Sequence, residues 1–413
     1  MKADAVVLGA GIIGISAALH LQARGRSVVL VDRRGAAEET SFGNAGLIQR
    51  EGVYPYGFPH DFGALLRYGL NRTVDAHYHL SALPELAPFL WKYWLHSRPA
   101  RHAAIARQYS QLIEHCVAEH DALAVQAGAT GLMRRNGWMR VFRTERERDT
   151  RFAEAARWRS EFGINFRSLD AGALQEAEPH LSPSLVGALH WIDPVSVIDP
   201  QALALAYLTL FESRGGRFLQ GNAASLNEQR DGWSLRTVDG PLQAGSVVVA
   251  LGPWADVVTR PLGYDLPLAV KRGYHMHYRA AGQARLNHPV LDTERGYMLA
   301  PMQRGIRLTT GAEFARRDAI RTPVQLGRAE QIARELFPLA ERLDNEPWMG
   351  ARPCTPDMMP IIGKAPRHAD LWFAFGHAHH GFTLGPVTGR LIAELIAGEA
   401  PFVDPVPYRP DRF

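Results

Sequence analysis

The chain has 413 residues, of which 46% are hydrophobic and 21% are charged. This length predicts two domains rather than one core, and the composition is that of an ordinary globular protein. The formal net charge is only +4 and the basic residues are interleaved with acids, so no nucleic-acid partner is predicted. Cys116 and Cys354, the two cysteines, lie far apart, which argues against a disulfide framework and a cysteine zinc site.

No run of about 18 or more uninterrupted apolar residues occurs, so the sequence predicts no integral membrane segment. Met1-Lys2 followed by apolar and small residues has the outline of a secretory signal peptide. The glycines and the acid described next favour a folded segment instead. Together with the two distant cysteines, this favours a cytoplasmic location.

The most informative local pattern stands at residues 9–14, where G-A-G-I-I-G follows the apolar run 5–8. That short run predicts a buried parallel strand. The first two glycines permit a tight turn and the close approach of a pyrophosphate, and the third lets the next helix pack closely. Asp32 ends the following apolar run, 28–31, where a carboxylate can accept hydrogen bonds from ribose hydroxyls. The pattern predicts a dinucleotide site; a glycine-rich turn without a ligand is the alternative.

Expected helices and strands alternate along the rest of the chain. The expected helical regions are 12–24, 83–127, 151–162, 199–213, 328–337 and 386–397. The expected strands are 5–8, 28–31, 137–142, 217–219, 233–237, 246–252, 274–278, 296–300, 306–310, 360–363 and 371–376. The wholly apolar run 246–252 suits a parallel strand buried on both faces, whereas the alternation over 266–310 suits an antiparallel sheet with one exposed face.

Parallel βα segments at the start, middle and end of the chain are separated by two insertions of mixed helix and strand. We therefore expect two interleaved domains. The first comprises residues 1–75, 196–263 and 341–413, and the second comprises residues 76–195 and 264–340.

Four motifs together resemble one family: residues 9–14 with Asp32, S-F-G-N-A-G at 41–46, G-A-R-P-C-T-P-D at 350–357, and the glycine-rich segment 376–385. On these motifs the chain resembles the D-amino-acid oxidase/dehydrogenase superfamily of FAD-dependent oxidoreductases over essentially its full length. It is most similar to the bacterial D-amino-acid dehydrogenases. The resemblance implies a combined α/β and α+β fold. An FAD-binding Rossmann-like domain of the glutathione-reductase type would be interleaved with a substrate domain built on a mixed antiparallel sheet.

The resemblance implies FAD as the cofactor, and the single G-x-G-x-x-G also favours FAD over a nicotinamide. The implied FAD contacts are Gly9, Gly11, Ile12, Ile13, Gly14, Asp32, Arg33, Ser41, Asn44, Ala45, Gly46, Leu47, Ala223, Ala250, Leu251, Gly252, Trp254, His380, Gly381, Phe382 and Thr383. A helix N-terminus near Gly385 can stabilise negative charge on a reduced flavin. Related sarcosine-type oxidases attach FAD through a cysteine, but the matching position here is Gly350 rather than Cys354. We therefore expect FAD to be bound non-covalently.

Arg352 is the main candidate for the substrate site, because a planar guanidinium can hold a carboxylate through two hydrogen bonds. Tyr297 resembles a family tyrosine that helps to bind that carboxylate, and Arg272 resembles an arginine that reaches the site from the substrate sheet. His379 is expected near the flavin or the substrate, where it can tune charge. The alternatives are a structural ion pair for Arg352, an ordinary strand aromatic for Tyr297, and a solvated strand end for Arg272.

The histidines are not expected to bind a metal. His377, His379 and His380 lie in one loop, but no nearby carboxylate or cysteine completes a set of ligands. The pairs His77/His79 and His275/His277 are expected to be structural.

The resemblance implies oxidation of the Cα–N bond of a D-amino acid, or of a proline-like amino acid, by hydride transfer to flavin N5. An imino acid would result, and water would convert it to a 2-oxo acid and ammonia. The implied partners are the amino-acid substrate and a quinone or other electron acceptor. A sarcosine- or glycine-type amine oxidase and a flavin-bearing subunit of a larger electron-transfer complex are the alternatives. Peripheral association with the inner face of a membrane, or with a hetero-complex, stays open.

Overall fold

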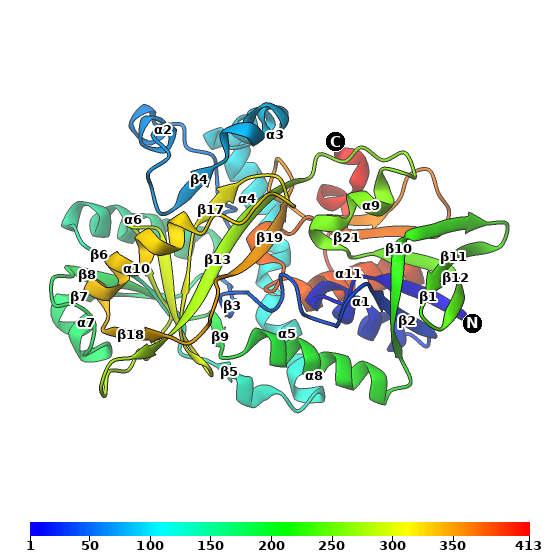
Figure 1. Cartoon of the computed structure of the whole chain (residues 1–413), viewed down its shortest axis with the longest axis horizontal. Helices are drawn as coiled ribbons and strands as arrows, with labels where there is room; N and C mark the ends of the chain where they lie inside the picture. Colours follow the sequence, from blue (N-terminus) through cyan, green and yellow to red (C-terminus); the bar gives the residue numbers. More distant parts are fainter.

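The computed structural model describes all 413 residues and places two large sheets toward the two ends of the molecule (Figure 1). The first sheet contains β1 (Lys2–Leu8), β2 (Val28–Asp32), β10 (Arg217–Gln229), β11 (Gly232–Thr237), β12 (Gly240–Val249), β20 (Ile361–Lys364) and β21 (Leu371–Phe375). The pairings β10–β2, β2–β1, β1–β12 and β12–β21 are parallel. β11 joins β10 to β12 and β20 pairs with β21, both antiparallel. The expected Rossmann-like parallel core is confirmed.

Both faces of this parallel core are covered by apolar groups. Val7 and Val248 lie on the face that packs against helices, whereas Val6 and Val247 lie on the face covered by the β10–β12 meander. Because successive side chains of a strand point to opposite faces, burial on both sides needs a continuous apolar run. This explains the uninterrupted hydrophobic sequence of β1 and of the end of β12.

Four helices form the layer on one face of the first sheet: α1 (Ile12–Gln22), α5 (Cys116–Gln126), α8 (Pro200–Ser213) and α11 (Gly385–Ala397). α1 lies beside α11, although the two come from opposite ends of the chain (Figure 1). Gly389 permits this approach, since a Cβ there would lie 2.5 Å from the carbonyl carbon of Ser16. The helix that follows the glycine-rich turn is therefore held in place by the C-terminal helix.

The second sheet has 11 strands, and most of its pairings are antiparallel. Its main path runs β4-β17-β13-β16-β15-β14-β6-β8-β7, and β18 and β19 also pair with β13. The strands are β4 (Ala76–Tyr78), β6 (Trp138–Phe142), β7 (Phe166–Asp170), β8 (Gly187–Trp191), β13 (Ala269–Ala280), β14 (Val290–Asp292), β15 (Tyr297–Met302), β16 (Gly305–Thr309), β17 (Ala312–Phe314), β18 (Leu339–Arg342) and β19 (Trp348–Cys354). α10 (Val324–Leu336) packs on it, while α6 (Glu145–Phe162) and α7 (Ala171–Ala177) lie near β6–β8.

The remaining elements lie between and around the two sheets. A small sheet contains β3 (Leu47–Ile48), β9 (Val195–Val197) and β5 (Met133–Arg134). The other helices are α2 (Phe62–Gly69), α3 (Leu83–His96), α4 (Pro99–Glu114) and α9 (Asp256–Thr259). The helical region expected over 83–127 is thus three helices, and Pro99 stands at the first break. None of the helices is at once long enough and apolar enough to span a bilayer.

Two elements cross the domain boundaries expected from sequence. α5, expected in the second domain, packs against α8 and α11 in the helical layer of the first sheet. β19, expected in the first domain, pairs with β13 of the second sheet along seven residues of register. Its last part therefore carries residues 350–354 to the boundary between the two sheets.

Candidate active site

One large cavity of about 1980 Å³ is lined by residues from both sheets. One end is lined by Asp32, Ala223 and Trp254, from the first sheet and the loops at its strand ends. Arg352 and His379 line another part, where β19 and the C-terminal segment approach. This arrangement can hold an elongated cofactor together with a small substrate.

The glycine-rich turn has the geometry that a pyrophosphate needs. Gly9 has φ of +104°, and a Cβ there would lie 2.5 Å from the carbonyl oxygen of Ala250. A Cβ at Gly11 would meet only the Ser41 hydroxyl oxygen, at 3.3 Å, on a wall of the cavity. The Ile12 N–H at the start of α1 donates to Ser41 Oγ at 3.0 Å. The backbone therefore forms a cradle at a helix N-terminus, as an anionic diphosphate requires.

Asp32 lies where a ribose is expected. Its Oδ2 accepts the N–H of Ala10 at 2.8 Å, and its Oδ1 accepts the N–H of Arg34 at 3.1 Å. These two bonds fix the carboxylate and leave acceptor capacity for ribose hydroxyls. Nearby, the Arg33 guanidinium stacks over the Trp254 ring, 4.4 Å from its centroid.

Seventeen of the 21 expected FAD contacts line the cavity: Gly9, Gly11, Ile12, Ile13, Asp32, Arg33, Ser41, Asn44, Ala45, Leu47, Ala223, Ala250, Leu251, Gly252, Trp254, Gly381 and Phe382. The other four, Gly14, Gly46, His380 and Thr383, do not. Gly14 packs α1 against the carbonyl of Gly9, where a Cβ would overlap that oxygen. The Gly46 carbonyl accepts the Val197 N–H at 2.7 Å beside the small sheet, and the Gly46 N–H donates to Asn44 Oδ1 at 2.8 Å. These four residues lie behind the cavity lining and shape its wall, so their contact with the cofactor stays a prediction.

The side chains of Thr383 and His380 are occupied elsewhere. Thr383 Oγ1 donates to the carbonyl of Leu47 at 3.1 Å and accepts the Gln49 N–H at 3.2 Å. His380 Nδ1 is 2.8 Å from the Tyr109 hydroxyl oxygen. Burial lowers the pKa of His380 to about 3, so this imidazole is neutral at physiological pH. α11 begins at Gly385, five residues later, where a helix N-terminus was expected.

The Arg352 guanidinium is half-buried on the cavity wall and has no acidic partner within ion-pair distance. Its Nη1 donates to the carbonyl of Gly311 at 3.0 Å, and longer contacts reach the carbonyls of Thr310 and Arg272. Burial lowers the pKa of Arg352, because no carboxylate offsets the loss of water. Gly273 makes room for it, since a Cβ there would lie 2.5 Å from Nη2. The guanidinium can therefore donate hydrogen bonds to the carboxylate of a bound ligand.

Arg272 does not reach the cavity, and the expected role of this residue in substrate binding is wrong. Its side chain is 0% exposed and pairs with Glu313 at 2.6 Å. Further donors bind the Tyr274 hydroxyl and backbone carbonyls, including that of Ala319 at 2.6 Å. Neighbouring residues of a strand face opposite sides of the sheet, and Arg272 faces the side away from Arg352. The alternative of a solvated strand end is equally wrong.

Tyr297, at the start of β15, lines the cavity as expected, but its hydroxyl is already engaged by protein groups. The side chain is 1% exposed, and the hydroxyl donates to Asp292 Oδ2 at 3.2 Å. Asp292 also pairs with Arg143 at 2.9 Å. A second carboxylate brought to this hydroxyl would meet the negative charge of Asp292. The structure therefore does not support the expected contact.

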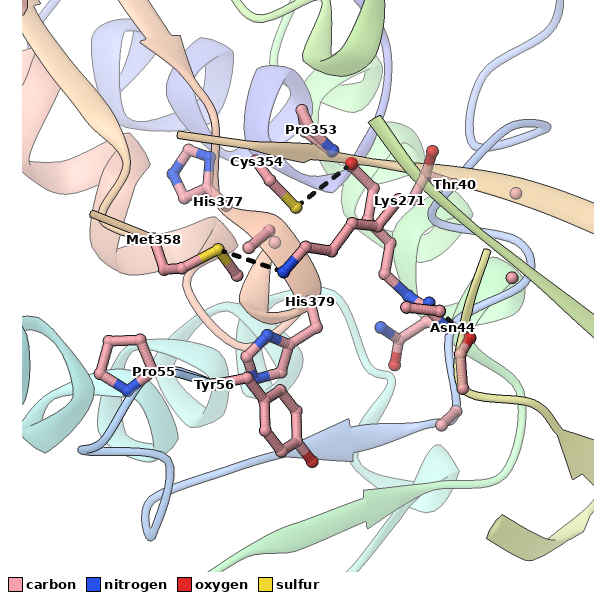
Figure 2. Close-up of a pocket in the computed structure, with 18 of the residues that line it drawn as sticks. Thr40, Asn44, Pro55, Tyr56, Lys271, Pro353, Cys354, Met358, His377 and His379 are labelled. Atoms are coloured by element: carbon pink, nitrogen blue, oxygen red, sulfur yellow. Dashed lines mark hydrogen bonds between the residues drawn. The ribbon is translucent and has the colours of Figure 1, made fainter. Parts of the chain in front are cut away.

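His379 lies at the same part of the cavity as Arg352, as expected, and its ring centroid is 4.4 Å from that of Tyr56 (Figure 2). Burial is the main cause that keeps the pKa of His379 well below its usual range. The positive charges of Arg352 and Lys271 add to the effect. His379 is therefore a neutral imidazole in this setting.

Lys271 also lines the cavity, although its sequence context does not single it out. It pairs in register with Arg352 across β13 and β19, and its ammonium lies near Met358 and His379 (Figure 2). In the sequence, Lys271 could have been found only as the neighbour of Arg272, since adjacent residues of a strand face opposite sides of the sheet. Choosing between the two required the strand register.

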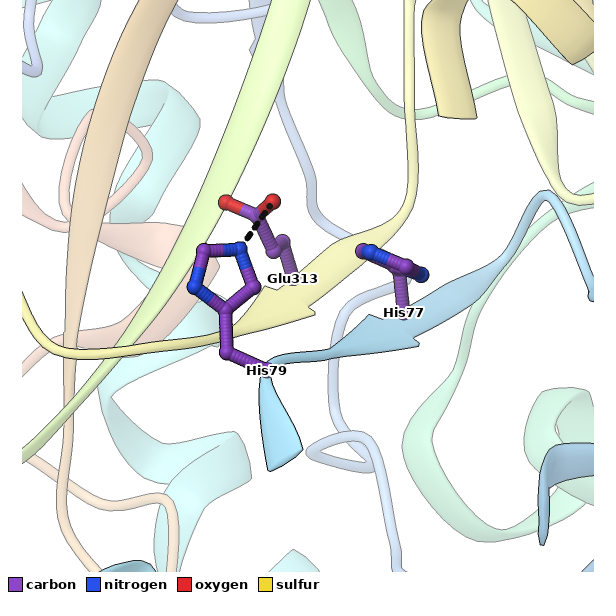
Figure 3. A group of neighbouring side chains, drawn as sticks. All are labelled: His77, His79 and Glu313. Atoms are coloured by element: carbon purple, nitrogen blue, oxygen red, sulfur yellow. Dashed lines mark hydrogen bonds and ion pairs between the residues drawn. The ribbon is translucent and has the colours of Figure 1, made fainter. Parts of the chain in front are cut away.

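The group His77, His79 and Glu313 brings three possible metal ligands together, outside the loop histidines considered above (Figure 3). Burial alone would raise the pKa of Glu313, but hydrogen bonds from Thr322, Arg272 and Tyr274 outweigh it and lower that pKa. His79 Nε2 lies 3.3 Å from the same carboxylate. Protein donors already occupy the Glu313 oxygens, so this group is an ion-pair network that anchors β4 and β17 to β13.

Comparison with known proteins agrees with this geometry. The family model described as "DAO: FAD dependent oxidoreductase" matches residues 4–395. The chain is 27% identical to a D-amino-acid oxidase of Bradyrhizobium diazoefficiens, covering 98% of each chain. It is 31% identical to a D-amino acid dehydrogenase of Methylobacterium radiotolerans, covering 96% of each.

Solved structures share the fold. Glycine oxidase from Geobacillus kaustophilus superposes with a TM-score of 0.75 at 23% identity, covering 100% of this chain and 99% of that one. L-proline dehydrogenase from P. horikoshii superposes with a TM-score of 0.74 at 19% identity, covering 100% and 98%. The cradle around Gly9 and Gly11, the anchored Asp32 and the family match together establish FAD as the cofactor. The chain belongs to the DAO family of FAD-dependent oxidoreductases.

Proposed function

We propose that the protein is a dehydrogenase that oxidises the Cα–N bond of a D-amino acid, including proline-like amino acids. The observation that carries the proposal is the Arg352 guanidinium, which lines the cavity without an acidic partner. A buried cation without a counter-charge is costly, and an anionic substrate group would offset that cost. The printed names of the relatives favour the D-amino acids among possible substrates.

In this proposal Arg352 binds the α-carboxylate through two hydrogen bonds and so fixes the orientation of Cα. FAD, when bound, supplies the acceptor for the Cα hydride at flavin N5. Because His379 is neutral, it does not repel the positively charged amine of an amino acid that approaches the site. The amine enters deprotonated, having released its proton to water, so no protein base is required before oxidation. The imino acid that forms is hydrolysed to a 2-oxo acid and ammonia, or stays a cyclic imine for a proline-like substrate.

The test is anaerobic mixing of the FAD-loaded protein with a panel of D-amino acids, D-proline analogues, their L-enantiomers and N-methylglycine. Bleaching of the flavin absorbance by D-amino acids, and its loss in Arg352→Met with flavin content intact, is the expected result. Unchanged bleaching in Arg352→Met would overturn the assignment of the carboxylate site. Bleaching by L-amino acids alone would overturn the stereochemical assignment.

An oxidase that returns electrons to oxygen is the second candidate, because one relative carries that name. The proposed dehydrogenase passes electrons to a quinone or another acceptor. Re-oxidation of the bleached protein separates the two, with oxygen and a soluble quinone compared in parallel. Faster re-oxidation by oxygen than by the quinone would favour the oxidase.

A further inference from the structure

Lys271 is a buried cation without a counter-charge in the same cavity. Its side chain is 7% exposed, and Nζ lies 3.7 Å from Met358 Sδ. The nearest aromatic contacts are Tyr93, with its ring centroid 3.9 Å from Nζ, and Phe314, with its centroid 5.4 Å away. No Asp or Glu lies within 4.0 Å of this ammonium.

These contacts leave the three donors of the ammonium without a good acceptor. A thioether is a weak acceptor, and cation–π attraction offsets only part of the cost of removing an ammonium from water. The neighbouring Arg272 is a buried cation with a structural role, and its charge is paired with that of Glu313. On the cavity side of the same strand, Lys271 is left unpaired.

Lys271 and Arg352 project from the same face of the sheet toward different walls of the cavity. They are register partners on antiparallel strands, so their Cβ atoms lie on one face. The Arg352 guanidinium lies over Gly273 and Gly311, whereas the Lys271 ammonium lies against Met358 and Tyr93. The positive charges of both lower the pKa of His379, which lines the same part of the cavity beside Lys271 (Figure 2). A ligand held by Arg352 therefore has a second cation available at its other end.

We propose that Lys271 binds an oxygen acceptor on the substrate side chain, either a second carboxylate or a hydroxyl group. This inference rests on the proposed function, because it assumes that Arg352 holds the α-carboxylate. It selects acidic or hydroxylated amino acids over purely aliphatic ones. The ammonium would gain a charge-assisted hydrogen bond in place of the thioether contact.

The test compares matched substrate pairs in the FAD-loaded protein: D-glutamate with D-norvaline, and 4-hydroxy-D-proline with D-proline. In the wild type, kcat/KM is expected to favour the oxygen-bearing member of at least one pair. Lys271→Met keeps the length of the side chain and removes the charge, and should reduce that preference by about tenfold or more. Lys271→Arg should restore part of it. The pair that responds identifies the acceptor as a carboxylate or a hydroxyl.

Lys364→Met is the matched control. Lys364 is exposed at the end of β20 and also lies near an aromatic ring, with Nζ 5.9 Å from the centroid of Trp372. This variant should keep the wild-type preference. If Lys271→Met lowers kcat/KM equally for both members of each pair, or slows only re-oxidation of the flavin, the proposed role is wrong.

A binding measurement separates this inference from the proposed function. Glutarate and butyrate are titrated against the flavin absorbance spectrum, without turnover. Tighter binding of glutarate than of butyrate, lost in Lys271→Met, would support the second cationic contact. This would hold even if no amino acid bleached the flavin. The absence of bleaching would refute only the proposed function. Equal affinities for glutarate and butyrate, together with no preference for 4-hydroxy-D-proline, would overturn the inference while leaving D-amino-acid oxidation intact.

Discussion

Two arginines on the paired strands β13 and β19 are expected to respond in opposite ways to the same substitution. Arg352 lines the cavity without an acidic partner, whereas Arg272 is fully buried against Glu313. Replacement by Met keeps the length and removes the charge. We expect Arg352→Met to abolish turnover with little change in stability, and Arg272→Met to unfold the protein readily.

The magnitudes follow from the contacts. Arg272→Met leaves the Glu313 carboxylate buried without its main partner, and breaking such a pair costs about 3–5 kcal/mol. Arg352→Met loses one good hydrogen bond, to the carbonyl of Gly311, which is worth about 1 kcal/mol. Relief from burying an unpaired guanidinium offsets part of this loss. For catalysis, losing two charge-assisted hydrogen bonds to the substrate is worth about 3–6 kcal/mol, or about 10² to 10⁴ in kcat/KM.

The assay pairs urea unfolding, followed by tryptophan fluorescence, with steady-state kinetics on the same preparations. The urea midpoint of Arg352→Met should stay near that of the wild type, while that of Arg272→Met should fall strongly. A large loss of stability in Arg352→Met with normal turnover would refute the reasoning, because it would make Arg352 a structural residue.

Three further predictions concern Glu51, which follows β3 and accepts the Trp138 indole N–H at 2.9 Å, and two residues of the first sheet and its helices. Burial raises the pKa of Glu51 to about 7, so the stability it contributes is full below pH 4.5 and is lost as pH rises through about 7. Between pH 5 and 8 the wild type should lose up to about 3 kcal/mol relative to Glu51→Gln, seen as diverging thermal midpoints. Gly389→Ala should push α11 from Ser16 and cost about 1–3 kcal/mol, whereas Gly327→Ala, with open space around it, should be near neutral in thermal unfolding. Asp32→Asn places an amide against the Ala10 or Arg34 N–H and should weaken FAD binding by about tenfold or more, measured by flavin fluorescence titration.

The parts of the fold that depend on short stretches of sequence were predictable. The glycine turn, Asp32 and the buried parallel strands need only local patterns, because each strand buried on both faces must be apolar throughout. The start of α11 at Gly385 was likewise visible, as was the strand now seen as β6. These features place the cofactor wall correctly.

The substrate wall was harder, because it depends on which face of a strand each residue occupies. Lys271 and Arg272 are adjacent, so one of them must face the cavity and the other must not. The partner of Arg272, Glu313, lies 41 residues later in the chain, and no local pattern links them. Tyr297 does line the cavity, but its hydroxyl is held by Asp292, its register partner across the β14–β15 pair. Strand register and pairing, rather than residue type, decide these roles.

The charge around the substrate is fixed by burial as much as by composition. Burial lowers the pKa of His377 to about 3 and keeps the pKa of His379 well below its usual range, so burial favours the neutral form of both imidazoles. Arg352 and Lys271 therefore supply positive charge beside His379, to which the buried histidines add little near neutral pH. A neutral His379 also leaves room for the amine end of an amino acid beside two cations that attract its carboxylate. The pH dependence of oxidation should consequently follow the protonation of the substrate amine rather than that of a histidine in the wall.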